Sequence, residues 1–260
     1  MNILEKIVAH KLQEIETQSM IVPIERLKSS QRLFAIRDFK QALKGDEIKI
    51  IAEIKRRSPS KNDIMMDADP VQVSVSYQMN GAAAISILTD QFYFGGHLNF
   101  IQQVKAAVAL PILRKDFIVS EYQVWESYHA GADAILLIAD AIDYGLLAKL
   151  YELSSELGMH TLVESHSIEN LDVIIDLKPD IAGLNCRNLR SMETDLSWFE
   201  TAYGKLPVNS IKIAESGIKN SDNLKFISDL GYDSALVGTS LMATGSPGVA
   251  LAQLLNRVPA

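Results

Sequence analysis

The sequence predicts a closed parallel (β/α)8 barrel, the TIM barrel, with an N-terminal helical extension, and three observations support this α/β fold class. The chain has 260 residues, close to the usual size of one such barrel. From Ile48 onward, short apolar runs alternate with longer amphipathic segments. Most apolar runs end in charged or polar residues, which is how this fold builds an active site at the carboxyl ends of its strands. We therefore expect one domain over residues 1–260, with the extension at 1–47 and the barrel at 48–260.

The hydrophobic pattern gives the position of each element. In the extension, Ile3, Ile7, Leu12 and Ile15 recur at helical spacing and predict the buried face of a helix. The later apolar runs alternate little, as expected of strands that are covered on both faces. Strands are expected at 48–55, 83–89, 111–115, 134–138, 160–164, 181–185, 211–215 and 235–238. Helices are expected near 70–80, 97–108, 120–130, 143–157, 167–177, 195–203, 220–230 and 246–256.

A weak internal repeat agrees with this order of elements. Gly81, Gly131 and Gly231 each stand between a predicted helix and the strand that follows it. Glycine tolerates the left-handed conformation that ends many helices. The same spacing also fits an open, doubly wound sheet, but eight strand–helix pairs favour the closed barrel over that alternative.

Composition and charge limit the class of protein. Hydrophobic residues make up 48% and charged residues 22% of the chain, as in a globular protein. No apolar stretch approaches the roughly 20 residues that cross a bilayer, and the N-terminus lacks the uninterrupted apolar core of a secretory signal. Cys186, the single cysteine, cannot form an internal disulfide, which fits a cytoplasmic protein. The net charge of −7 argues against nucleic acid or an anionic membrane as partner, and a monomer is the default expectation.

The first predicted strand ends in a pair of opposite charges. Glu53 and Lys55 are two residues apart, so both side chains point to the same face, which is the interior in a barrel. A buried charge is costly unless it is paired. The pair indicates a mutual ion pair or a functional site, unless the strand stops at Ala52 and both side chains are solvated.

Charged residues also end the third, fifth and seventh predicted strands. Lys115 lies between Arg114 and Asp116, and strand alternation directs it opposite to these two neighbours. A lysine in a partly dry site between carboxylates stays protonated and can donate a proton. Glu164 and Glu215 close the other two strands, where two carboxylates can serve as base and electrostatic partner. Taken singly, each of these ends also fits a solvated loop.

The remaining strand ends carry groups that recognise hydroxyls and anions. Asn185 can hydrogen-bond a hydroxyl and Arg187 can hold a carboxylate or phosphate, whereas Cys186 between them points the other way and fits a core thiol. Gly217 and Gly238 follow the last two strands. Backbone N–H groups and a short helix commonly hold a phosphate there in this fold. Ordinary loop glycines are the alternative.

The five histidines show no metal-ligand spacing such as HExxH, so no metal site is expected. His160 and His166 flank the fifth predicted strand, and we interpret both as structural or exposed. The chain also lacks a Walker or GxGxxG loop, so nucleotide binding is not indicated.

Together these residues give the chain a close resemblance to the indole-3-glycerol phosphate synthase family. The similar stretches are AEIKRRSPSK, LTDQFYFGG, PILRKDFIVSEYQV, GADAILLIA, LVESH, GLNCRNL, AESGI and LVGTSLM, which span Ile51 to Met242. The resemblance implies a carbon–carbon lyase (a carboxy-lyase) of tryptophan biosynthesis that needs no cofactor. Its small anionic substrate is 1-(2-carboxyphenylamino)-1-deoxyribulose 5-phosphate, which closes a ring and loses carbon dioxide and water to give indole-3-glycerol phosphate.

The resemblance also implies a role for each site residue. Lys115 matches the family's general acid, Glu164 its acid–base carboxylate, and Lys55 its second catalytic lysine, whose share in dehydration and substrate anchoring stays open. The residues that match the polar lining around the substrate are Glu53, Asn185, Arg187, Glu215 and Ser216. Those that match positions near the phosphate are Ser58, Gly217, Gly238 and Thr239. The candidates for the apolar wall around the anthranilate ring are Phe92, Phe94 and Phe117.

Three positions depart from the family's pattern. Asn62 stands where glycine is usual, Cys186 replaces the second Asn of the usual NNR, and His97 replaces a common serine. Of these, Asn62 is expected to matter most, because it lies in the first loop and can change how that loop moves.

Two other functions are weighed against the synthase. The first is a phosphosugar isomerase on the same fold, such as the phosphoribosylanthranilate isomerase, but the RKDF stretch counts against it. The second is a catalytically silent barrel kept for binding or scaffolding, but the intact Lys55, Lys115 and Glu164 speak against that.

Overall fold

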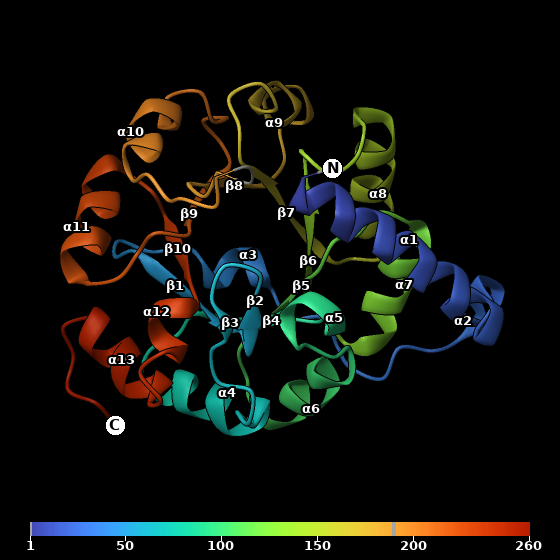
Figure 1. Ribbon diagram of the computed structural model, residues 1–260, viewed down its shortest axis with the longest axis horizontal. Coiled ribbons are helices and arrows are strands. Elements are labelled where there is room, and N and C mark those ends of the chain that lie inside the picture. The colour runs from blue at the N-terminus through green and yellow to red at the C-terminus, as the bar shows by residue number, and fades with distance from the viewer. Residues whose placement is uncertain (1, 189–190) are drawn as a thin grey trace.

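The computed structural model describes residues 2–188 and 191–260, and its centre is a closed barrel of eight parallel strands (Figure 1). Around the barrel the strands follow the order β1-β10-β9-β8-β7-β6-β5-β4. The strands are β1 (Lys49–Ile54), β4 (Ala84–Leu88), β5 (Ile112–Lys115), β6 (Ala134–Ile138), β7 (His160–Ser165), β8 (Ile181–Asn185), β9 (Ile211–Glu215) and β10 (Ser234–Val237). Each lies within one residue of its expected bounds. The closed order confirms the barrel and excludes the open sheet.

A helix follows each strand and covers the outside of the barrel. The outer helices are α4 (Pro70–Met79), α6 (Asn99–Ala107), α7 (Glu121–Ala130), α8 (Tyr144–Glu156), α9 (Leu171–Leu177), α10 (Ser197–Tyr203), α11 (Ser221–Leu230) and α13 (Pro247–Leu254). Side chains cap several of them, as when Asp143 accepts a hydrogen bond from the Leu146 N–H at the start of α8. Gly131 and Gly231 end α7 and α11 with a φ of 97° each, as the repeat predicts.

Short elements are inserted in the loops at the carboxyl ends of the strands. These are the hairpin strands β2 (Arg57–Ser58) and β3 (Asn62–Asp63) after β1, α5 (Gln91–Phe94) after β4, and α12 (Thr239–Met242) after β10. They lie beside the strand tips and so form part of the rim around the mouth of the barrel.

The core has two layers because side chains alternate along each strand. One cluster fills the inside of the barrel and includes Ile51, Leu113, Leu162 and Ile213. A larger cluster lies between the strands and the outer helices. Within the described residues, no helix combines the length and apolarity that a membrane span requires.

The N-terminal extension touches both ends of the barrel. It consists of α1 (Ile3–Ile21), α2 (Ile24–Ser29) and α3 (Phe39–Ala42). α3 appears in the centre of the ring in Figure 1, and its Phe39 packs into the cluster inside the barrel together with Leu43. The backbone carbonyl of Leu43 accepts a hydrogen bond from Ser234 at the start of β10, so this part closes the amino end. Side chains of α1 line the cavity at the opposite, carboxyl end.

The buried face of α1 differs from the predicted one. Leu12 is 53% exposed, and the buried residues are Leu4, Ile7 and Lys11. The prediction for Leu12 is wrong because Lys11 takes the inward position. Its ammonium group pairs with two buried carboxylates, at 2.9 Å from Asp90 and 3.2 Å from Asp116. The helical spacing of apolar residues cannot predict a buried lysine, because the carboxylates that pair with it lie far along the chain.

Candidate active site

The third barrel strand, β5, ends in three charged residues that point in two directions. Lys115 points into the mouth of the barrel, where it lines the cavity. Arg114 and Asp116 point outward and are buried, and their side chains pair at 3.0 Å. The Arg114 guanidinium also donates to the backbone carbonyl of Gln123 on α7. This confirms the opposite directions that strand alternation predicts.

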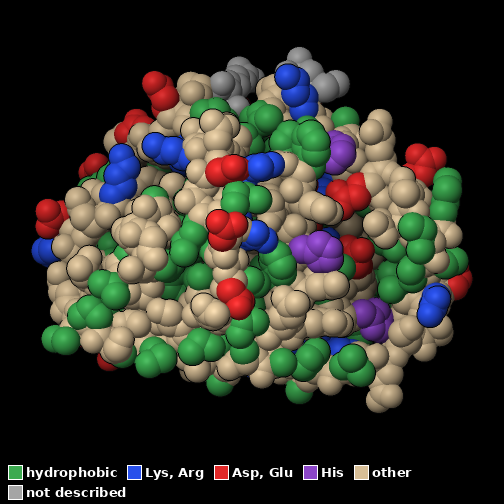
Figure 2. Space-filling model, turned by 60° about the horizontal axis from the view of Figure 1, so that its bottom comes forward, with side chains coloured by type: hydrophobic (Ala, Val, Ile, Leu, Met, Phe, Trp, Pro, Cys, Tyr) green, Lys and Arg blue, Asp and Glu red, His purple; other side chains and the backbone are tan. Residues whose placement is uncertain are grey.

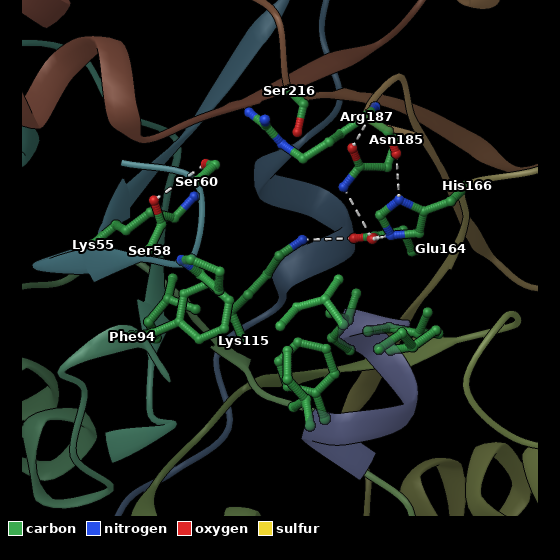
Figure 3. Close-up of a pocket in the computed structure, with 18 of the residues that line it drawn as sticks. Lys55, Ser58, Ser60, Phe94, Lys115, Glu164, His166, Asn185, Arg187 and Ser216 are labelled. Carbon is green, nitrogen blue, oxygen red and sulfur yellow. Dashed lines mark hydrogen bonds and ion pairs between the residues drawn. The ribbon is translucent and has the colours of Figure 1, made fainter. Parts of the chain in front are cut away.

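The Lys115 ammonium group lies between two carboxylates from other strands. It contacts Glu164 Oε2 at 2.6 Å and also Glu215 Oε2 (Figure 3 shows the first contact). Burial alone would lower the pKa of Lys115, but the charges of Glu164, Glu215 and Glu53 outweigh it and raise the pKa above its ordinary value. The group is therefore a stable ammonium, with a proton to give.

Glu164, at the carboxyl end of β7, is held on both oxygens. Oε1 lies 3.1 Å from Asn185 Nδ2 and 2.5 Å from His166 Nε2, while Oε2 faces Lys115. Burial opposes ionisation, yet the cationic Lys115 and the imidazole of His166 hold the pKa of this carboxyl well below its usual range. Glu164 is thus an ionised carboxylate inside the cavity.

His166 is a site residue that the sequence interpretation missed. Its side chain is only 8% exposed and it lines the cavity, so it is not the exposed histidine that one interpretation predicts. Its spacing from Glu164 could have revealed it. His166 stands two positions after Glu164, and residues two apart at the end of a strand point to the same face.

Glu215, at the carboxyl end of β9, differs from Glu164 in the direction of its pKa shift. Burial and the nearby charge of Glu164 raise the pKa of Glu215 well above its usual range, although Lys115 acts in the opposite direction. The side chain fits because β8 carries Gly183 beside it, where an added Cβ would overlap Glu215 Oε1. Glu164 and Glu215 therefore contact the same lysine with pKa values that are shifted in opposite directions.

Glu53 and Lys55 at the end of β1 form an ion pair with each other, which is one of the possibilities that their spacing predicts. Lys55 Nζ lies 2.5 Å from Glu53 Oε1, and Glu53 is 1% exposed. Apart from this ion pair, the Glu53 oxygens have no hydrogen-bond partner among the described residues. Gly238 makes room for this glutamate, because an added Cβ there would lie 2.9 Å from Glu53 Cβ and overlap Oε1.

The cavity around these charges has an apolar wall and a polar wall. The Phe94 and Phe117 rings lie 5.9 Å apart on the apolar wall, with Ile7 of α1. Further apolar lining comes from Leu4, Leu136 and Ile138. Figure 3 shows Lys55 and Ser58 on one side of the cavity and Glu164, His166 and Asn185 on the other, with Lys115 reaching between them. The predicted residues on the polar wall are Ser58, Arg187, Ser216, Gly217, Gly238 and Thr239.

Phe92 does not belong to this wall. It is 63% exposed and packs against His10 and Tyr93, with ring centroids 4.9 Å apart in both cases. Two residues along a helix are separated by about 200° of rotation, so Phe92 and Phe94 on α5 point to opposite sides. The prediction that Phe92 lines the anthranilate wall is wrong for this reason.

The turn after β9 forms part of the polar wall through Ser216 and Gly217. Ser216 and Gly217 have φ values of 71° and 73°, two left-handed residues in succession. Such a conformation is rare for serine and is found mainly where surrounding structure and function require it. Cys186 lies behind this turn, since a Cβ on Gly217 would lie 2.9 Å from its Sγ. Burial raises the pKa of the Cys186 thiol to about 11, as expected of a core cysteine.

Asn62, the departure in the first loop, has a φ of 54° at the start of β3. Among non-glycine residues, asparagine adopts this left-handed region most readily, so the backbone keeps the conformation that glycine gives with ease. The exchange of glycine for asparagine therefore preserves the hairpin turn.

Within residues 2–188 and 191–260, no group of three or more His, Cys, Asp or Glu side chains is arranged to hold a metal ion. The titratable groups at the strand tips instead pair with one another.

Comparison with known proteins agrees with this geometry. The family model for indole-3-glycerol phosphate synthase matches residues 4–254. The chain is 40% identical to the indole-3-glycerol phosphate synthase of Bacteroides thetaiotaomicron over 258 residues, which is 99% of each chain. It is also 40% identical to that of Paenarthrobacter aurescens over 253 residues, or 95% of this chain and 93% of the relative.

Solved structures support the fold alone. The 3-hexulose-6-phosphate synthase of Salmonella typhimurium superposes with a TM-score of 0.62 at 15% identity, over 80% of this chain and 99% of that one. A chain of the tryptophan synthase complex of Pyrococcus furiosus gives 0.59 at 14% identity, over 80% and 97%. With the family model and the relatives covering nearly its whole length, the chain belongs to the indole-3-glycerol phosphate synthase family.

Proposed function

We propose that the cavity at the carboxyl ends of the strands carries out the family's reaction with the residues described above. This reaction closes the indole ring of 1-(2-carboxyphenylamino)-1-deoxyribulose 5-phosphate, with loss of carbon dioxide and water, in tryptophan biosynthesis. The observation that carries the assignment is the placement of Lys115 between Glu164 and Glu215 in a cavity with one apolar and one polar wall.

The two walls match the two ends of the substrate. The rings of Phe94 and Phe117 suit the flat anthranilate ring, which gains from burial against aromatic side chains. The substrate's phosphate suits the N–H groups after β9 and β10, at Gly217 and Gly238, with Arg187 and Thr239 beside them. The ketone carbon then lies between the walls, where Lys115 ends.

Lys115 is the general acid of the first step. As the ring carbon attacks the ketone carbon, the ketone oxygen takes the Lys115 proton and becomes a hydroxyl group. Carbon dioxide then leaves from the ring carbon that made the attack, and its loss restores the aromatic ring. A lysine whose pKa is raised by flanking carboxylates is suited to hold this proton until charge develops on the oxygen.

Glu164 is the acid–base group of the dehydration. It is ionised, so it can accept the proton that must leave the new ring. The Lys55 ammonium on the opposite wall supplies the proton with which the hydroxyl group departs as water. Lys55 completes the set of charged groups on the opposite wall, and Glu53 holds its ammonium in place. Glu53, Asn185, Glu215, Ser58 and Ser216 orient the substrate and set the charges of the lysines.

Turnover of the substrate by Lys115→Met tests this assignment. We expect purified wild-type protein to form indole fluorescence from the substrate without added metal or nucleotide. The kcat of the variant should fall by about 10²–10⁴-fold, the usual contribution of general acid–base catalysis. Its dissociation constant for the substrate should stay within a few-fold of the wild-type value. Lys149→Met, which changes an exposed lysine, is the matched control. Near-normal kcat in Lys115→Met would refute the role.

We further infer that the protein acts as a single-domain monomer in the cytoplasm, without nucleic acid or membrane as partner. On the face seen in Figure 2, acidic and basic side chains are interspersed, and the net charge is −7. Binding to a polyanion needs a field of positive charge, which this face does not present. The contacts of α1 and α3 with both ends of the barrel support one domain. A light-scattering mass of two chains would contradict the monomer.

A further inference from the structure

His166 follows β7 directly, and both of its ring nitrogens have partners in the protein. Nε2 lies 2.5 Å from Glu164 Oε1, and Nδ1 lies 3.0 Å from the backbone carbonyl oxygen of Arg187 (Figure 3). The backbone N–H of His166 donates to Asp140 Oδ2 at 2.9 Å, which fixes the start of the loop. With the side chain 8% exposed, the protein rather than bulk water determines where the ring protons lie.

These two partners determine the protonation of the ring. A carbonyl oxygen can only accept a hydrogen bond, so Nδ1 must carry a proton. An ionised carboxylate can also only accept, so Nε2 must carry a proton whenever Glu164 is ionised. The contact between His166 and an ionised Glu164 is therefore an imidazolium–carboxylate pair. A neutral ring would face Glu164 with a lone pair, and that arrangement needs a protonated Glu164, which is no longer a base.

The charges around His166 favour the imidazolium. Glu164 on β7 and Asp140 after β6 are negative, while Lys115 on β5 and the guanidinium of Arg187 after β8 are positive and lie beyond these contacts. The lining that α1 contributes to the same cavity is apolar. Burial opposes the charged ring, but Glu164, the Arg187 carbonyl and Asp140 outweigh it and raise the pKa of His166 above its ordinary value.

We propose that His166 is a positioning residue for the reaction: its imidazolium keeps Glu164 ionised and fixes the carboxylate for proton removal from the substrate. Asn185 holds the same oxygen with a neutral amide, so the amide supplies orientation and His166 supplies both orientation and charge. The His166 ring keeps its own two protons through the reaction. The proton taken from the substrate stays on Glu164 until Glu164 releases it. This inference rests on the acid–base role proposed for Glu164.

The pH profile of His166→Gln separates this role from a structural one. Glutamine can still donate a hydrogen bond to Glu164 but carries no charge. Loss of a cation at this distance should raise the pKa of Glu164, so the acid limb of kcat/KM should move to higher pH by about 1–3 units. Activity at pH values above that limb should change little. A histidine with a merely structural role would lower activity by the same factor at every pH.

His160→Gln is the matched control, because His160 begins the same strand at the opposite end of the barrel and faces Asp38 at 3.3 Å. It should keep the wild-type pH profile. A His166→Gln profile with the wild-type shape, whether lowered uniformly or unchanged, would overturn the proposal.

A second measurement uses the wild-type protein and does not depend on how the variant folds. In protein labelled with ¹⁵N-histidine, we expect both ring nitrogens of His166 to be protonated at about pH 7.5, one unit above the ordinary histidine pKa. The signals missing from His166→Gln identify the residue. A neutral His166 ring at this pH would overturn the proposal.

Glu164→Gln distinguishes failure of this inference from failure of the proposed function. Substantial turnover by Glu164→Gln would refute the catalytic role of Glu164 itself. An inactive Glu164→Gln together with a wild-type profile for His166→Gln would refute only the role of His166. In Glu164→Gln the His166 ring should also lose protons at lower pH than in the wild type, because its anionic partner is gone.

Discussion

At the scale of single residues, the chemistry of each group is set by its partners rather than by its type. Glu164 and Glu215 are the same amino acid on the same lysine, yet the pKa of Glu164 is lowered and that of Glu215 is raised. The difference arises because Glu164 also faces the imidazole of His166, whereas burial and the charge of Glu164 act on Glu215. Two carboxyl groups with opposite shifts are what acid–base chemistry needs near neutral pH.

Glycines next to the carboxylates are a second feature at this scale. Gly238→Ala should destabilise the fold by about 1–3 kcal/mol, the usual cost of overpacking, because the new Cβ would overlap the buried Glu53 side chain. Displacement of Glu53 should also lower kcat/KM. Urea unfolding and steady-state kinetics measure the two effects.

Gly204→Ala is the control for that substitution. Gly204 ends α10 with an ordinary φ of −68°, and an added Cβ there has no neighbour within 4 Å. We expect its free energy of unfolding to stay within about 0.5 kcal/mol of the wild type. If Gly238→Ala also leaves the free energy of unfolding unchanged, the Glu53 side chain can move away from the added Cβ without cost.

At the scale of elements, α1 is both a wall of the cavity and a support for the strand that carries Lys115, the proposed general acid. Its Ile7 lines the cavity, and one helical turn later Lys11 reaches Asp90 and Asp116. Asp116 follows Lys115 in the chain, and Asp90 caps the start of α5. One lysine thus connects α1 to two loops at the carboxyl end of the barrel.

Lys11→Met should therefore cost about 3–5 kcal/mol of unfolding free energy. The substitution keeps the length of the side chain but leaves the buried Asp90 without its cation, while Asp116 keeps only Arg114. An unpaired buried charge is strongly destabilising. Urea denaturation measures the change. Lys6→Met, an exposed position on the same helix, should change stability by less than about 0.5 kcal/mol. Equal stability of the two variants would show that α1 does not depend on this buried pair.

At the scale of the whole molecule, barrel closure brings together residues that are far apart in the chain. Lys115 and Glu215 are separated by 100 positions, yet they are in contact because both end strands at the same rim. The same closure buries charges on the outer side of the strands, where Asp116 accepts hydrogen bonds from Thr89 at 2.5 Å and Arg114 at 3.0 Å.

The buried Asp116 predicts how stability depends on acid. Burial opposes its ionisation, but Arg114, Lys11 and Thr89 outweigh it and lower the pKa of Asp116 to about 2. Because the folded pKa lies below the ordinary value of 3.8, the unfolded chain binds more protons between these values. This stabilisation, about 2 kcal/mol, is complete above about pH 5 and is lost progressively as the pH falls toward 2.

Urea unfolding at a series of pH values between about 5 and 2 measures this contribution. Asp116→Asn should be less stable than the wild type at neutral pH and should show a shallower fall in stability over the acid range. Asp229→Asn, at an exposed ion pair on α11, should follow the wild-type curve. An unchanged acid slope in Asp116→Asn would show that other carboxyl groups account for acid unfolding.

The barrel, its strand bounds and most of the residues that meet at its mouth could be predicted from the amino-acid sequence. This is possible because strand periodicity and polar strand ends are local properties of the chain, as at Glu53 and Lys115. Which charges pair and which side chains turn away from the cavity depends on how the strands and loops are arranged in space. Lys11 is buried, His166 holds Glu164, and Phe92 leaves the cavity wall. Each depends on partners from distant strands or on the direction of a short helix, and electrostatic energy depends on distance in space rather than on separation along the chain.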